Sequence, residues 1–87
     1  MKVTKELVAN QLLAYLQHRL SLATLIKWAE DMILEASFPE SDTDMLMDVL
    51  AHIGLANVRQ FGLTWEDCET LMLQLGYQLQ VEARQAA

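Results

Sequence analysis

Cys68, His18 and His52 are the side chains of this sequence whose types could support nucleophilic or transition-metal chemistry. None of them stands at metal-ligand spacing from another. Cys68 is predicted in the first turn of a helix, where the helix dipole lowers a thiol pKa and where His52 could act as its base. However, Asp67 and Glu69 flank the thiol and oppose a thiolate. We therefore expect Cys68 to be a small buried core residue, with a cysteine-dependent enzyme as the alternative.

The segment 42–44, Asp-Thr-Asp, is similar to the start of a calcium-binding loop. Leu46 stands where the next oxygen ligand is needed, and Met47 occupies the position that requires glycine, so an EF-hand is excluded. The three glycines are isolated from one another, which excludes a glycine-rich phosphate loop. We expect no metal ion, no cofactor, no catalytic residues and no enzymatic activity.

Acidic residues are distributed unevenly along the chain. The first 27 residues carry a net charge of +3, the segment 28–58 has seven acidic residues and no lysine or arginine, and the remainder carries −2, which together give −6. Asp31 and Glu35 are four residues apart, as are Asp44 and Asp48, so each pair shares one helix face. An acidic face steers a protein toward a basic partner, whereas the alternative is an ordinary solvated face. The candidate partner-binding residues are Glu30, Asp31, Glu35, Asp44 and Asp48.

Size and composition restrict the class of protein. The chain has 87 residues and a mass of 9.9 kDa, enough for one domain, and 53% of its residues are hydrophobic. Twelve acidic against six basic residues and a pI near 4.6 argue against direct binding to nucleic acid or to an anionic membrane. A single cysteine cannot form an internal disulfide, and the apolar runs are too short to span a bilayer. We expect a cytoplasmic protein.

Apolar residues recur at steps of three and four in the first two thirds of the chain, as in amphipathic helices. The first helix is expected over residues 5 to about 20, with Thr4 as its N-cap. Ser21 caps the second helix, which ends before Pro39 because the residue before a proline is disfavoured in helical conformation. The connection would be only one or two residues long, which predicts antiparallel or sharply crossed neighbours.

A third helix is expected after residues 40–44, which supply N-cap candidates, and it should end at Gly54. Its expected buried stripe is Leu46, Val49, Leu50 and Ile53. The stretch 55–62 is consistent with either a helical turn or an extended segment.

The fourth helix has the strongest start signal of the sequence. Thr64 can cap it and Asp67 stands at the third helical position, although the usual capping box has Glu or Gln there. Leu63 and Cys68 occupy the two positions of a hydrophobic staple. The helix should end at Gly76.

The alternation of apolar and polar residues over Tyr77–Val81 predicts a short C-terminal β-strand. Because a lone strand is unstable, it would pair either with the stretch 58–63 or with another chain. Pairing with a second copy, through this strand or through surface methionines such as Met45 and Met47, would make the protein a homodimer. The expected fold is mainly α, a compact bundle of four to five helices forming a single domain over 1–87, with a frayed tail at 83–87.

The phrases Ser21-Leu22, Leu25-Ile26-Lys27-Trp28-Ala29-Glu30, Phe61-Gly62-Leu63-Thr64-Trp65-Glu66-Asp67-Cys68 and Leu75-Gly76-Tyr77 resemble a group of short bacterial proteins without an assigned activity. The resemblance covers most of residues 5–77 and implies no functional residue set. In size, charge and helical class the chain is also similar to bacterial immunity proteins and antitoxins, which neutralise basic toxins. The sequence therefore predicts a small acidic protein-binding module, with a homodimeric assembly protein as the alternative.

Overall fold

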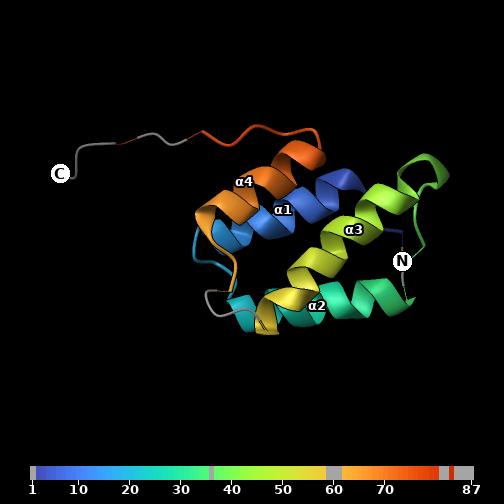
Figure 1. Ribbon diagram of the computed structural model, residues 1–87, viewed down its shortest axis with the longest axis horizontal. Helices are drawn as coiled ribbons and strands as arrows, with labels where there is room; N and C mark the ends of the chain where they lie inside the picture. Colours follow the sequence, from blue (N-terminus) through green and yellow to red (C-terminus); the bar gives the residue numbers. More distant parts are fainter. Residues whose placement is uncertain (1, 36, 59–61, 81–82, 84–87) are drawn as a thin grey trace.

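The protein is mainly helical, as the computed structural model in Figure 1 shows. The structure describes residues 2–35, 37–58, 62–80 and 83. The elements in order are α1 (Lys5–Leu16), α2 (Leu22–Glu35), a 3-10 turn (Glu40–Asp42), α3 (Thr43–Gly54), a second 3-10 turn (Leu55–Val58) and α4 (Trp65–Gln74). Four α-helices confirm the expected helical bundle. No helix among the described residues combines the length and the apolar character needed to cross a membrane.

The helices pack as two neighbouring pairs. The most extensive contact joins α2 and α3, which cross each other in the lower part of Figure 1, while α1 and α4 lie together in the upper part. The two pairs are connected because α1 also packs on α2 and α4 also packs on α3. All four helices therefore border one interior.

Side-chain caps start α1 and α2 where the sequence predicts them. The Oγ1 atom of Thr4 accepts a hydrogen bond of 3.2 Å from the amide of Leu7. The Oγ atom of Ser21 accepts one of 3.2 Å from the amide of Thr24. Each bond satisfies an amide that has no partner within the first turn of its helix, so both N-cap predictions are confirmed.

A reciprocal capping box starts α4. Thr64 Oγ1 accepts from the Asp67 amide at 3.1 Å, and an Asp67 carboxylate oxygen accepts from the Thr64 amide at 3.0 Å. Leu63 and Cys68, the two residues predicted to form the staple, are both buried. The shorter aspartate therefore completes the box that glutamate or glutamine usually forms.

The first helix is shorter than predicted: it ends at Leu16 rather than near residue 20. His18 has a φ of +61°, and the amides of His18 and Arg19 donate to the carbonyls of Tyr15 and Ala14, at 3.1 and 2.9 Å. This is the Schellman arrangement, which satisfies the last helical carbonyls and turns the chain. Five residues therefore connect α1 to α2, instead of one or two. The sequence did not indicate this end because non-glycine residues are uncommon in the left-handed conformation and no glycine stands near it.

Gly76 ends α4 by the same arrangement, in agreement with the prediction. Its φ is +93°, and the amides of Gly76 and Tyr77 donate to the carbonyls of Leu73 and Met72, at 3.0 and 2.8 Å. α3 ends at Gly54, as predicted, but without the left-handed residue that ends α4. Leu55 instead continues in right-handed conformation into the 3-10 turn.

Residues 77–80 lie in no strand, and no bridge joins them to another described segment, so the predicted C-terminal strand is absent over these residues. Val81 and the central part of its predicted partner segment lie outside the described residues. Leu79 instead packs against the apolar core. The isolated β-bridge of the described chain joins Lys2 to Ser37 in parallel.

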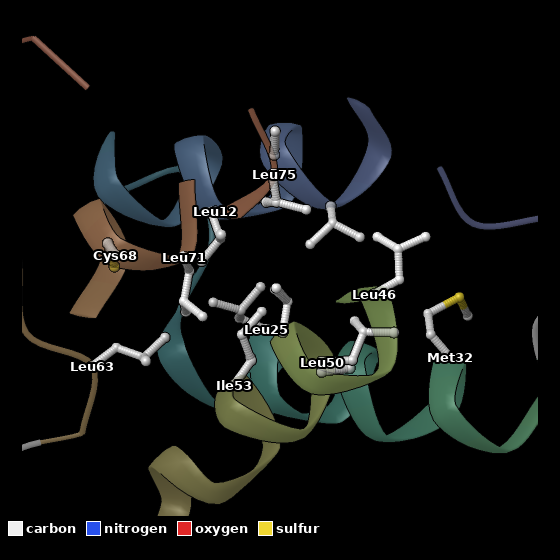
Figure 2. Packing of buried hydrophobic residues seen from close by; sticks show 14 of the residues in the cluster. Leu12, Leu25, Met32, Leu46, Leu50, Ile53, Leu63, Cys68, Leu71 and Leu75 are labelled. Atoms are coloured by element: carbon white, nitrogen blue, oxygen red, sulfur yellow. The ribbon is translucent and has the colours of Figure 1, made fainter. Parts of the chain in front are cut away.

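One apolar core joins the four helices. Figure 2 shows Leu12 of α1, Leu25 of α2, Ile53 of α3 and Leu71 of α4 meeting in it. The full stripe predicted for the third helix is buried. No polar or charged residue is buried in the described part of the chain, so burial of apolar surface is the main force that holds the helices together.

Two leucines of α2 provide a direct test of this core. Leu25 is completely buried, whereas Leu34 is 82% exposed. We expect Leu25→Ala to lower the free energy of unfolding by about 2–5 kcal/mol, because it removes apolar contacts and leaves a cavity. The matched variant Leu34→Ala should change it by less than about 0.5 kcal/mol. Urea denaturation followed by circular dichroism measures both, and equal effects would contradict the packing described above.

Candidate functional site

The five acidic residues proposed from the sequence lie on the outside of α2 and α3; we call them the acidic surface. Four of them are exposed, and Asp31 is half-buried. They are Glu30, Asp31 and Glu35 on α2, and Asp44 and Asp48 on α3. Their exposure is what a docking surface for another protein requires, and it also agrees with ordinary solvated helix faces.

Helix geometry divides the acidic surface into three parts. Asp31 and Glu35 share one flank of α2, whereas Glu30 is about 100° away around the helix and faces α3. The Cγ atom of Glu30 lies 3.8 Å from the position that a Cβ would take at Gly54, near the end of α3. Asp44 and Asp48 share one side of α3, and Asp48 on this side reaches Gln74 of α4. The structure therefore brings Glu30 close to α3, while the two predicted pairs remain on different flanks.

Two members of the acidic surface have partners within the chain. The Lys27 ammonium is 3.5 Å from a carboxylate oxygen of Asp31, one helical turn away. The Gln74 amide donates a hydrogen bond of 2.9 Å to Asp48 and so connects α4 to α3. Lys27–Asp31 is the ion pair found among the described residues. Within this part of the chain, Glu30, Glu35 and Asp44 have no ion-pair partner.

A shallow hollow of about 430 Å³ lies beside Asp31 on the outer side of α2. The described residues that line it are Ala23, Thr24, Lys27, Trp28 and Asp31. Trp28 is half-buried and packs against the core, while part of it lines the hollow. The sequence analysis did not connect Trp28 to Asp31. The three-residue spacing between the two is the signal that could have done so.

A second, smaller hollow of about 180 Å³ lies where the end of α1 meets the start of α4. Its described lining consists of Tyr15, Leu16, His18, Leu63 and Trp65. The Tyr15 hydroxyl donates a long hydrogen bond of 3.5 Å to the Leu63 carbonyl. Burial raises the pKa of the Tyr15 phenol. Nothing in the sequence indicated this hollow, because it depends on the unexpected turn at His18.

The thiol of Cys68 is fully buried on the inner side of α4, as predicted for a core residue. Burial raises the thiol pKa to about 11, and the nearby negative charge of Asp67 contributes to the rise. Cys68 is therefore a neutral thiol near neutral pH and a poor nucleophile. His52, its proposed base, is an exposed residue in the last turn of α3.

No group of three or more histidine, cysteine or acidic side chains in the described part of the chain is arranged to hold a metal ion. The methionines divide between core and edge. Met32 and Met72 are buried, while Met45 and Met47 are half-buried and Met45 packs against the core. The predicted surface methionines are therefore only partly available for contact with another molecule.

Comparison with known proteins found no matching protein family, no matching curated protein and no matching solved structure. The resemblance to short bacterial proteins, immunity proteins and antitoxins therefore stays a prediction from the sequence.

Cys68 should make stability depend on pH in the alkaline range. The thiol pKa rises from an ordinary value of 9.0 to about 11 on folding, so the folded chain keeps a proton that the unfolded chain loses. This contribution to stability is complete below pH 9 and disappears as the pH rises toward 11. Over that range, we expect urea midpoints to fall more steeply for the wild type than for Cys68→Ala. Parallel slopes would contradict a raised thiol pKa.

Proposed function

We propose that the protein is a non-enzymatic binding module of the cytoplasm whose acidic surface docks on a basic protein. The observation that carries this proposal is the exposure of acidic side chains on both α2 and α3, within a segment, 28–58, that has no lysine or arginine. The chain resembles immunity proteins and antitoxins in size and charge. The specific form of the proposed function is therefore docking on a basic toxin or nuclease.

The electrostatics support the proposal in two ways. Glu30, Glu35 and Asp44 have no ion-pair partner in the described chain, so a basic partner would pair with them without breaking an internal contact. A surface of one sign also raises the association rate of an oppositely charged protein, by about 10-fold to 1,000-fold at low ionic strength. The same attraction is screened by salt, with a Debye length of about 8 Å at physiological ionic strength.

Neutralising the acidic surface should weaken this docking. We expect the triple variant Glu30→Gln, Glu35→Gln, Asp44→Asn to capture less of a basic protein that the wild type retains from lysate. The loss should be largest at low salt, because the lost attraction is a long-range one. The readout is the amount of each retained protein, by quantitative mass spectrometry, against salt concentration.

A matched control has the same change in net charge on other helices: Glu6→Gln, Glu66→Gln and Glu69→Gln, all at exposed positions of α1 and α4. If both triple variants lose the same partner equally, only net charge matters and the acidic surface is not the docking site. If neither variant loses it, the proposal is wrong.

The second candidate is a homodimeric assembly protein, because two exposed apolar side chains lie near the end of α4. Leu73 is 59% exposed and Tyr77 is 38% exposed. Contact between such large apolar side chains and water is unfavourable. A second copy that packed against them would remove this apolar surface from water.

Light scattering on a sizing column distinguishes the two candidates. A homodimer should have twice the chain mass of 9.9 kDa, and Leu73→Lys together with Tyr77→Lys should return it to the mass of one chain. The exposed pair Leu34→Lys and Leu55→Lys is the matched control. A mass of one chain at every concentration would exclude the homodimer and leave the binding module.

A further inference from the structure

The hollow on α2 combines an aromatic side chain, a carboxylate and an opening to solvent. Trp28 and Asp31 line it together, and its volume of about 430 Å³ leaves room for one long side chain of another protein. Trp28 also packs against the core, which holds its ring in place before any partner arrives. A site whose wall is already ordered loses little conformational entropy when it is filled.

The carboxylate of Asp31 already holds a cation at the edge of this hollow. The Lys27 ammonium lies 3.5 Å from it, yet the Lys27 side chain is 79% exposed and that of Asp31 is 45% exposed. Exposed ion pairs of this kind contribute little to stability, so exchanging Lys27 for an outside cation has a small cost. Glu35 follows on the same flank of α2 and adds negative charge.

A cation next to an indole ring gains a further attraction from the ring's quadrupole, which is strongest for tryptophan. Among protein side chains, arginine fits this combination best. Its planar guanidinium stacks on aromatic rings and forms directed hydrogen bonds to carboxylates, and it is more weakly hydrated than the lysine ammonium. The apolar stem of arginine would lie along the apolar part of the hollow.

We propose that the Trp28 hollow is a docking site for an arginine side chain of the basic partner, held between the indole of Trp28 and the carboxylate of Asp31. The inference rests on the proposed function, since it specifies which basic side chain the acidic surface receives and where. Lys27 then occupies the site in the free protein and moves aside when the arginine enters.

The test uses three short synthetic peptides built on glycine and serine, with arginine, lysine or uncharged citrulline at the centre. Binding is followed by NMR titration of the Trp28 indole resonance, with Trp65 as the internal reference. The arginine peptide should bind about threefold to tenfold more tightly than the citrulline peptide, which has nearly the same shape without the charge. The lysine peptide should lie between them. Equal binding by all three, or no shift at Trp28, would overturn the proposal.

Two pairs of variants locate the site. Lys27→Gln should strengthen binding of the arginine peptide by about twofold to threefold because it frees Asp31, whereas Lys2→Gln, with the same change in charge, should have a smaller effect. Asp31→Asn should weaken binding more than Asp44→Asn. Equal effects within either pair would mean nonspecific attraction and would overturn the proposal.

These outcomes are separate from those for the proposed function. The triple variant of Glu30, Glu35 and Asp44 retains both Trp28 and Asp31, so it tests docking on a basic protein without removing the arginine site. An arginine peptide that fails to bind while the triple variant loses its partner overturns the arginine site and leaves the acidic surface. If the arginine peptide binds but the triple variant loses no partner, the docking surface is overturned and the arginine site remains.

Discussion

The structure depends on the burial of a single leucine-rich core among four short helices. Each helix has 10–14 residues, a length at which an isolated helix is only marginally stable in water. No described charged residue is buried, so apolar contact must supply most of the energy that keeps the helices formed. Leu25 is central to this arrangement, because Figure 2 shows it near residues from the other three helices. The caps and turns set where each helix begins and ends, while burial of its apolar side chains in the core makes the helix stable.

Placing every described charge outside the core leaves a surface with excess negative charge. The net charge is −6, and a single ion pair, Lys27–Asp31, is found within the described residues. Mutual repulsion among these carboxylates opposes compactness slightly, and a basic partner would relieve it. This repulsion does not stabilise the fold, so the acidic surface agrees better with the proposed binding role than with a role in stability.

The two hollows arise in different ways. The smaller one exists because His18 turns the chain at the end of α1 and brings this end close to Trp65. The larger one lies on α2, where Trp28 is held at the border between core and solvent. Tyr15 in the smaller hollow and Trp28 in the larger one both pack against the core and also line their hollow. Such a ring is a suitable contact for another molecule, because little of its freedom is left to lose on binding.

Local signals in the sequence determined the helical class, the caps at Thr4 and Thr64, the buried stripe of α3 and the position of Cys68. These features depend on residues a few positions apart, and the spacing of such residues directly indicates a helix. Two local features were missed in the sequence: the left-handed turn at His18, which ends α1 early, and the hollow that Trp28 and Asp31 of α2 border. Only the tertiary structure decided that the acidic pairs of α2 and α3 lie on different flanks and that the leucines of separate helices meet in one core. These placements depend on how whole helices pack, and packing joins residues that are distant in the sequence and whose contacts no local pattern encodes.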